Sequence, residues 1–530
     1  MPKQKRLFWI GALAAAVAFD LLFWKQALGI SFFIWTAALL LIGYLLAWRE
    51  QKRPSVLSWG LSLLILGFAF VPAWRAEPFT RVISVMLTLV GMLLLTATFL
   101  NGFWPFYRIV DHFTELFKAL FGGLSGAILY GTRFRNPPAV GEEPAQVKGK
   151  KGWAILRGVL IAVPVVTLFT ILLSAADPVF GDWIKKVLNL ERLPEYLFRL
   201  WYVLMIGSFL VGIYLHALYP RSEAKKPETM SAWMKPFLGW TETGIILGAV
   251  DALFIAFVII QMRYLFGGTA NINETGYTFA EYARRGFGEL VAVAVLSMML
   301  YLGLNTISKR ETRGARIGFS LVSILLMANV LVMLVSSLQR LMLYEGAYGF
   351  SELRTYTHVF IYWLGALIVV AVVLEILRKS GRFALALMIA IIGFGATLAV
   401  MNVDGFIVNQ NVKRAAAGEE LDFNYLQQLS TDAVPAMVNA YLQPGLPANA
   451  KDVLGSALAC RTAELNTPVV GDSGLKSWQS FSISESKAAR LLTDNAGTWS
   501  TYMVNDDEER GLTITLDGVE KSCAGFDWMD

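Results

Sequence analysis

Charged residues, histidines and cysteines are scarce in this sequence of 530 residues. Only 16% of the residues are charged, against about 25% in typical soluble domains, so water is not the main solvent of the chain. The three histidines, His112, His216 and His358, lie far apart, and no His/Cys or paired-carboxylate spacing indicates a zinc or di-metal site. A phosphate-binding glycine loop, a nucleophile elbow and a dinucleotide fingerprint are also missing. We therefore expect no metal and no cofactor, and an enzymatic function has little support.

Long apolar runs, by contrast, fill the first 400 positions. Each approaches or reaches the roughly 18 to 25 residues that carry a helix across a hydrocarbon core of about 30 Å. A helix satisfies its own backbone hydrogen bonds in lipid, so the predicted fold class is an all-α polytopic membrane protein with about 11 transmembrane helices. The predicted spans are Leu7–Phe23, Leu28–Trp48, Val56–Trp74, Val82–Leu100, Trp153–Ser174, Leu197–Leu218, Trp240–Met262, Gly286–Leu304, Ile317–Ser337, Thr357–Leu377 and Phe383–Met401.

Lysine and arginine are distributed over the loops in a way that orients the chain. The loops on the side of the amino terminus hold 24 of these residues, and the opposite loops hold 11. Because short positively charged loops stay in the cytoplasm, we expect the amino terminus inside and the carboxyl terminus outside. The basic residues are dispersed, which argues against a nucleic-acid partner. The start of the chain also fits a cleavable signal peptide, an alternative that leaves the other spans in the same orientation.

The composition changes near Asn402, which divides the chain into a transmembrane domain, 1–402, and a soluble extracytoplasmic domain, 403–530. In the second domain, helical spacing of apolar residues predicts two short helices over 421–429 and 434–441. Ser482 and Glu485 have the spacing of a capping box, and 498–504 with 512–516 have the composition of a β-hairpin. We therefore expect a small, mainly helical α+β domain.

Both cysteines, Cys460 and Cys523, lie in this second domain. The loop charges place the domain on the oxidising side of the membrane, where a disulfide between them is expected. The alternative is two buried free thiols, because two cysteines can fall in the same quarter of a chain by accident.

The longest predicted cytoplasmic loop contains an amphipathic segment over about 105–121. Its apolar residues recur at helical spacing, while charged residues occupy the other faces. A helix of this kind either lies in the membrane interface or packs on the helix bundle. The stretch 133–152 has three prolines and scattered charges, and we predict that it is a mobile connector.

The predicted extracytoplasmic loops are short but rich in arginine, tyrosine and acidic residues. Guanidinium and phenol groups suit contact with a phosphate, a carboxylate or a lipid headgroup. Aromatic interface belts, and ion pairs that only join loops together, explain the same residues without a ligand. The candidate polar site comprises Asp177, Arg263, Tyr264, Glu281, Tyr282, Arg284, Arg285, Arg340, Tyr344, Glu345 and Arg354.

Asp251 lies near the centre of the seventh predicted span, where an acidic side chain costs about 2.5 to 3.5 kcal/mol. Protonation, or a hydrogen bond from a residue such as Asn329 in the ninth span, would compensate this cost. Glu242 precedes Asp251 by nine residues and therefore faces the opposite side of the helix. Asp20, Arg157, Arg199 and Glu375 lie near span ends and have less functional weight, since such side chains can reach the interface.

Several local strings, in this order along the chain, are similar to a known family. They are LLSAADPVF at 172–180, QMRYLFGG at 261–268, AEYARRGF at 280–287, the segment 341–356, and LDFNYLQQLSTDAVPAM at 421–437. Together they resemble the bacterial multi-pass membrane family catalogued as domain of unknown function 4173, which is related to family 4153. The resemblance covers nearly the whole chain and implies a bacterial inner or cytoplasmic membrane protein, without assigning catalytic residues.

Three functions are compatible with these features. In the first, the protein handles an ion, a small solute or a lipid at its extracytoplasmic face, with Asp251 inside the membrane. In the second, it is an envelope sensor or assembly component whose external domain binds a partner protein. In the third, it is a membrane-embedded envelope enzyme. The expected partners are the lipid bilayer and an envelope protein, lipid or small solute.

Overall fold

The computed structural model describes residues 5–133, 193–220, 235–265, 287–466, 477–507 and 511–524, with scattered positions between 158 and 180. The chain forms two compact units. Unit 1 comprises Met1–Leu66, Leu89–Trp104 and Phe113–Ala224. Unit 2 comprises Gly67–Thr88, Pro105–His112 and Lys225–Asp530. Three helices, α3, α4 and α5, contribute to both units because their residues fall on either side of these boundaries.

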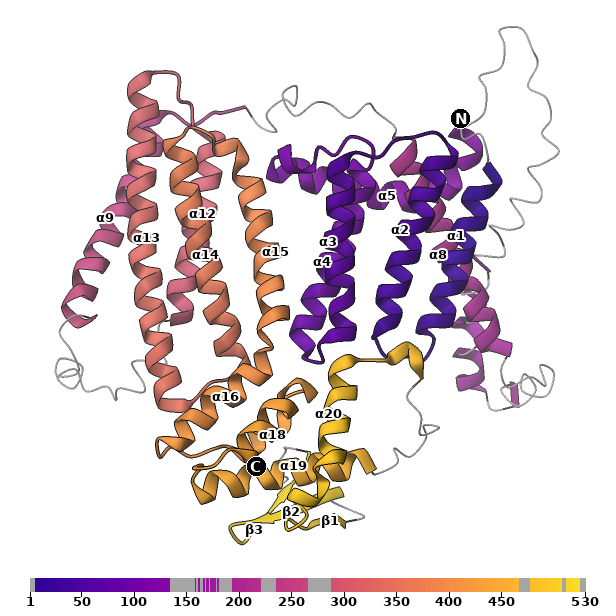
Figure 1. Cartoon of the computed structure of the whole chain (residues 1–530). Helices are drawn as coiled ribbons and strands as arrows, with labels where there is room; N and C mark the ends of the chain where they lie inside the picture. Colours follow the sequence, from indigo (N-terminus) through magenta and orange to yellow (C-terminus); the bar gives the residue numbers. More distant parts are fainter. Residues whose placement is uncertain are drawn as a thin grey trace. The chain divides into compact units, whose positions relative to one another are not determined.

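Long apolar helices make up most of the described chain (Figure 1). They are α1 (Lys5–Phe23), α2 (Ile30–Arg49), α3 (Val56–Trp74), α4 (Pro78–Thr98), α5 (Ile109–Arg133), α8 (Leu193–Leu218), α9 (Trp240–Leu265), α12 (Phe287–Ile307), α13 (Arg313–Tyr348), α14 (Glu352–Ile376) and α15 (Phe383–Met401), with 3-10 turns η1 (Trp104–Phe106) and η3 (Ser380–Arg382).

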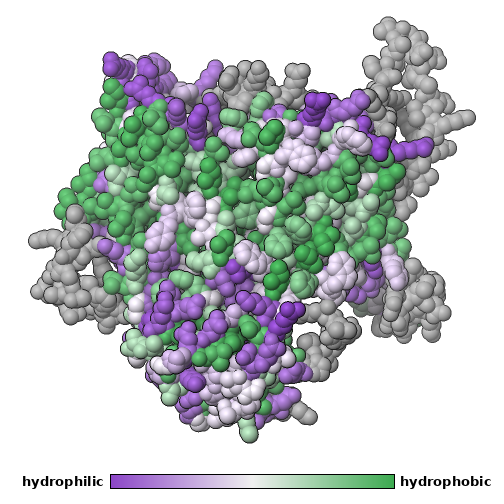
Figure 2. All heavy atoms as spheres, viewed as in Figure 1, coloured by the Kyte–Doolittle hydropathy of each residue, from purple (hydrophilic) through white to green (hydrophobic). Residues whose placement is uncertain are grey.

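Ten helices of the described residues are long and apolar enough to cross a membrane. They coincide with ten predicted spans, so the all-α polytopic class is confirmed. The predicted span Trp153–Ser174 falls mostly outside the described residues, as does the connector 133–152. Figure 2 shows hydrophobic side chains over the flanks of the long helices and hydrophilic ones at helix ends and over the C-terminal domain, the distribution that a bilayer requires.

Helix α13 is longer than its predicted span. It begins after Thr312, whose side chain accepts a hydrogen bond from the Ala315 amide, and ends at Gly349, whose φ of 80° suits glycine. Its 36 residues span about 54 Å, against a hydrocarbon core of about 30 Å. The prediction ended at Ser337 because the following residues are polar, but outside hydrocarbon a polar helix can continue.

The helix α5 is also longer than the predicted amphipathic segment, and it starts later, at Ile109. In unit 1, Phe113, Phe117 and Phe121 leave one side of it exposed. On another side it approaches α8 closely, because a Cβ on Gly212 would lie 2.2 Å from the Gly123 carbonyl oxygen. The helix therefore crosses α8 at a glycine pair and presents its phenylalanines outward.

In unit 2, α9 and α12 pack on α13, which packs on α14, and α14 packs on α15. Their interior is an apolar core that includes Leu247, Phe319, Leu326 and Ile368. A second core joins the ends of α14 and α15, at Val359 and Leu398, to buried residues of the C-terminal domain. In unit 2 the domain is thus continuous with the helices on which it rests.

The C-terminal domain begins directly after α15. Its elements are α16 (Val403–Ala416), α17 (Phe423–Gln428), η4 (Thr431–Ala433), α18 (Val434–Leu442), α19 (Ala448–Asn466), η5 (Trp478–Ser480), α20 (Ile483–Asp494), η6 (Ala496–Thr498), β1 (Val504–Asp507), β2 (Gly511–Leu516) and β3 (Val519–Ser522). The helices α17 and α18 confirm the two predicted from apolar spacing. The boundary between 402 and 403 stays a prediction.

The three strands form an antiparallel sheet in the order β1-β2-β3. Val504 pairs with Ile514, and Leu516 pairs with Val519. The predicted hairpin therefore exists, but its first strand starts only at Val504, and β3 was not predicted. Asp517 and Gly518 both have positive φ, as the two-residue turn between β2 and β3 requires, so this Asp-Gly pair was the overlooked signal.

The predicted capping box at the start of α20 is wrong. Ser482 is the N-cap residue, but its side chain makes no capping hydrogen bond. Instead its hydroxyl accepts from the Arg81 guanidinium at 3.4 Å, and Glu485 pairs with the same guanidinium at 3.5 Å. A charged donor from α4 thus takes the two side chains that would otherwise have capped the helix.

Candidate functional site

Asp251 is buried in unit 2, with 3% of its surface exposed, near the middle of α9. The amide of Asn329 on α13 donates a long hydrogen bond of 3.4 Å to Asp251 Oδ1. Asp251 Oδ2 has no hydrogen-bond partner among the described residues. Glu242, on the same helix, is exposed and accepts from the Gly239 amide at 2.6 Å. One carboxyl group is therefore half-satisfied inside the helix bundle, and the other caps its own helix.

Further buried polar atoms lie on the helices that carry this pair. Ser336 follows Asn329 by seven residues, two helical turns, and so lies on the same side of α13. Gln261 follows Asp251 by ten residues on α9. The Ser336 hydroxyl and the Gln261 amide nitrogen are buried without a partner in the described part of the chain. We call Asp251, Gln261, Asn329 and Ser336 the polar seam.

The end of α13 and the start of α14 bring together three residues of the predicted polar site. The Arg354 guanidinium lies 4.1 Å from the centre of the Tyr344 ring and donates to the Tyr348 carbonyl at 3.2 Å. Glu345 is buried, and the His358 ring nitrogen Nδ1 lies 3.2 Å from its carboxylate. These side chains mainly bind one another and the end of α13, which is how a helix terminus is stabilised.

Of the other predicted polar residues, the structure describes only the side chains of Asp177 and Arg340. Asp177 accepts a hydrogen bond from the Val179 amide at 2.8 Å and is exposed. Arg340 is half-buried on α13. The remaining side chains lie outside the described residues: Arg263, Tyr264, Glu281, Tyr282, Arg284 and Arg285. A single site made from the whole predicted set stays a prediction.

Sequence reasoning missed a group of carboxylates in unit 2 whose charges interact, which we call the acidic junction: Glu77, Glu352, Asp404 and Asp432. Asp432, from η4, accepts hydrogen bonds from the backbone amides of Ala76 and Glu77 at 2.8 and 3.1 Å. Glu77 in turn accepts from the amides of Phe79 and Thr80 at the start of α4, at 2.6 and 2.7 Å. The C-terminal domain therefore supplies a cap for the turn between α3 and α4.

Asp404 is the most deeply buried carboxyl of the junction, with no exposed surface. Its Oδ2 accepts from the Ser430 amide at 2.8 Å, and its Oδ1 has no partner among the described residues. Burial raises the pKa of Asp404, opposed by the hydrogen bonds from Ser430, while the charges of Glu77 and Asp432 add to the rise. Among the described residues, the acidic junction included, no three His, Cys, Asp or Glu side chains are arranged so that they could hold a metal ion.

Cys460 of α19 and Cys523, just after β3, are joined by a disulfide with a Cα–Cα distance of 5.3 Å. Both residues are buried in the core of the C-terminal domain. Next to the disulfide in sequence, the buried Arg461 donates to the carbonyls of Leu426 and Leu429 at 2.8 and 2.6 Å. Burial lowers the pKa of Arg461. The bridge and the arginine together tie α19 to the sheet and to the end of α17.

Unit 1 contains an ion pair whose members sequence reasoning had given little weight. The Arg199 guanidinium on α8 donates to both carboxylate oxygens of Asp20 on α1, at 2.9 and 2.5 Å. The Tyr202 hydroxyl donates to the same carboxylate. Their positions near span ends are consistent with the prediction, but they bind each other instead of reaching separately for the interface.

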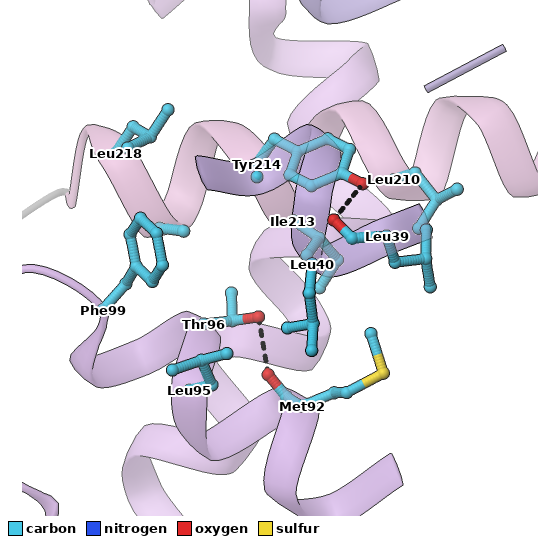
Figure 3. A pocket seen from close by; sticks show the side chains of 12 residues that line it. Leu39, Leu40, Met92, Leu95, Thr96, Phe99, Leu210, Ile213, Tyr214 and Leu218 are labelled. Atoms are coloured by element: carbon cyan, nitrogen blue, oxygen red, sulfur yellow. Dashed lines mark hydrogen bonds between the residues drawn. The ribbon is translucent and has the colours of Figure 1, made fainter. Parts of the chain in front are cut away.

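Unit 1 also contains an apolar pocket between α2, α4 and α8 (Figure 3), with a volume of about 50 Å³. Two polar side chains are seen at its wall. The Tyr214 hydroxyl donates to the Leu39 carbonyl at 3.1 Å, and the Thr96 hydroxyl donates to the Met92 carbonyl at 2.8 Å. Both hydroxyls are thus engaged within the helices, and the pocket suits an apolar group.

The model of a family described as a domain of unknown function, DUF4153, matches residues 61–440, which is more than half of the chain. No curated protein and no solved structure matches. The match therefore shows membership of family 4153, which the sequence resemblance gave as a relative of family 4173. Membership of family 4173 itself is not shown.

Proposed function

We propose that this chain, which belongs to the DUF4153 family, is a membrane protein that takes up and releases protons at Asp251 inside the bilayer. The observation that carries the proposal is the incomplete hydrogen bonding of Asp251, which is 3% exposed and has one carboxylate oxygen without a described partner. Polar groups inside a membrane are costly, and those retained there commonly serve ion or proton pathways.

The polar seam supports this proposal. Its buried amide and hydroxyl groups lie along two packed helices, α9 and α13. Buried polar groups without protein partners are commonly hydrogen-bonded to internal water. A water molecule that is hydrogen-bonded to a carboxyl group can accept the carboxyl proton and return it. A proton is also the ion that needs the fewest ligands, in keeping with the absence of a metal-ligand group among the described side chains.

The test uses the full chain reconstituted in vesicles with a pH-sensitive dye inside. We expect an imposed pH gradient to decay faster with the wild-type chain than in protein-free vesicles. Asp251→Asn should reduce the decay to the protein-free rate. Glu242→Gln is the matched control, since Glu242 is an exposed carboxylate on the same helix. Equal decay with wild type and Asp251→Asn would rule out the proposed role.

Infrared spectra of the same samples test the site separately. The carboxylic acid C=O band of a neutral Asp251 should be present in the wild type, persist in Glu242→Gln and vanish in Asp251→Asn. If the band is unaffected by Asp251→Asn, the protonated group is elsewhere.

A second candidate function is an envelope sensor or assembly component. The observation that favours it is the coupling within unit 2, where Asp432 of the C-terminal domain holds the α3–α4 turn. A partner bound by the domain could shift such a turn and so act on the helices. Photo-crosslinking from exposed residues of the domain would test this. Loss of the domain without any effect on growth or envelope integrity would count against it.

The location and orientation of the protein in the membrane are inferred from its loop charges. We propose a bacterial cytoplasmic membrane with the amino terminus in the cytoplasm and the C-terminal domain outside, because basic residues favour the loops on the amino-terminal side, 24 to 11. A disulfide between Cys460 and Cys523 suits an oxidising compartment. Periplasmic reporter activity is expected from a fusion at the carboxyl terminus, and cytoplasmic reporter activity would reverse the orientation.

A further inference from the structure

The apolar pocket of unit 1 has room for a guest. Its volume of about 50 Å³ is several times the roughly 10 to 15 Å³ that one water molecule needs. The wall is formed by side chains of α2, α4 and α8, all of which are long and apolar enough to span a membrane. The pocket therefore lies among helices whose natural solvent is the hydrocarbon of lipid tails.

The chemistry of the wall selects an apolar guest. Figure 3 shows leucine, isoleucine, methionine and phenylalanine side chains around the space. The hydroxyls of Tyr214 and Thr96 are directed to backbone carbonyls and donate there. Water in the pocket would thus find few hydrogen-bond partners, and water needs about two to four of them. An alkyl chain needs none.

The end of the pocket is defined by the ends of two helices. Leu218 is the last residue of α8, and Phe99 follows the last residue of α4, and both line the pocket. The next residue, Tyr219, donates its hydroxyl to Glu50 at 2.6 Å, and the Lys52 ammonium lies 5.2 Å from the centre of the Tyr219 ring. A cationic side chain therefore stands beside the end of an apolar pocket.

The surroundings of Lys52 are those of a membrane interface. Arg49 and Arg53 lie near it in sequence, so that the segment 49–53 carries three cations and a single carboxylate, that of Glu50. Trp48 is largely exposed, and the Arg49 guanidinium lies 5.1 Å from the centre of its ring. Exposed tryptophan with nearby basic residues marks the level of lipid headgroups. The net positive charge favours a phosphate there.

From this arrangement we propose that unit 1 binds one anionic phospholipid, with a short part of an acyl chain in the pocket lined by Gly43 and Tyr214 and the phosphate at Lys52. The apolar part of the lipid would contact the apolar pocket, and the phosphate would contact the basic segment at Lys52. The acyl chain leaves no polar group of the wall unpaired, and the phosphate brings negative charge to a basic turn. The site is independent of Asp251, which belongs to unit 2.

Native mass spectrometry of the delipidated full chain, after addition of phosphatidylglycerol or phosphatidylcholine, tests the proposal. The wild type should retain one tightly bound phospholipid and should prefer phosphatidylglycerol. Gly43→Leu should abolish that retention. A Cβ at this position would touch only the Tyr214 ring, at 3.5 Å, so the new side chain fills the pocket without a backbone clash.

Three further variants make the result specific. Gly60→Leu is the matched control, because Gly60 is an exposed glycine of α3 with nothing within 4 Å of its Cβ position, and it should bind as the wild type does. Ala217→Leu fills the pocket from α8 and replaces Gly43→Leu if that variant does not fold. Lys52→Gln should weaken binding of phosphatidylglycerol about fivefold and that of phosphatidylcholine less, because the choline cation offsets the charge of the phosphatidylcholine phosphate.

Two results would overturn the proposal. One is a folded pocket-filling variant that retains phosphatidylglycerol as tightly as Gly60→Leu does. The other is a wild-type chain that retains no phospholipid under conditions in which it remains folded. If Lys52→Gln weakens both lipids equally, the headgroup part of the assignment is wrong.

Discussion

Removal of the Asp432 carboxylate should release the turn between α3 and α4 from the C-terminal domain. Asp432 is 3% exposed, and its Oδ2 accepts from the amides of Ala76 and Glu77 at 2.8 and 3.1 Å. A hydrogen bond to a charged group contributes about 1.5 to 3 kcal/mol, so the two together contribute about 3 to 6 kcal/mol. Relief from burying a charge offsets part of the loss in Asp432→Ala. We expect a net cost of about 3 kcal/mol.

Hydrogen exchange measures this cost locally. A loss of about 3 kcal/mol corresponds to roughly a hundredfold faster exchange if the amides exchange by local opening. Mass spectrometry of peptides covering 70–80 and 428–436, with the full chain in nanodiscs, gives both sides of the contact. Asp432→Asn keeps an acceptor oxygen and should have a smaller effect.

Asp494→Ala is the control, since Asp494 is an exposed carboxylate at the end of α20. It should leave both peptides unchanged. The reasoning is refuted if Asp432→Ala folds and the amides of 76–80 exchange at the wild-type rate.

Three other predictions concern the disulfide, the buried carboxyl and the ion pair. Replacement of Cys460 and Cys523 by serine opens a loop of 63 residues and should destabilise the C-terminal domain by about 4 kcal/mol in the chain-entropy model, measured by thermal unfolding with and without reductant. Because burial raises the pKa of Asp404 above its ordinary value of 3.8, the folded chain holds this proton more tightly than the unfolded chain. Stability should therefore fall as pH rises from about 4 through the raised pKa, and Asp404→Asn should flatten this dependence in chemical unfolding between about pH 4 and 8. Arg199→Ala should cost about 2 kcal/mol by leaving Asp20 without its cationic partner, and adding Asp20→Ala should restore part of the loss of thermal stability, whereas additive effects would contradict a coupled pair.

The transmembrane part was predictable because each span is a local pattern. About twenty apolar residues between charged loops identify a membrane helix without knowledge of its neighbours. Helices α17 and α18 were found for the same reason, since their apolar spacing is visible within a few residues. The ends of α5 and α13 were misjudged because the helix continues where the hydrophobic signal stops.

The acidic junction could not be predicted in this way. Glu77 and Asp432 are separated by 355 positions, and each alone looks like an ordinary surface carboxylate. Only the fold shows that one carboxylate caps a distant turn. Asp20 and Arg199, 179 positions apart, were underrated for the same reason. The candidate site at Asp251 needed only local information, because a carboxyl in the middle of an apolar run is conspicuous in itself.

The length of α13 has a mechanical consequence. A rod of about 54 Å inside a hydrocarbon layer of about 30 Å projects well beyond it, and at its far end Arg414 of α16 holds the carbonyl of Gly346 at 2.9 Å. Helices adjust to a change in bilayer thickness by tilting, and on so long a rod a small tilt becomes a large sideways movement at the tip. A change in the thickness of the surrounding lipid would therefore move the tip of α13 and, through its contact with Arg414, reach α16.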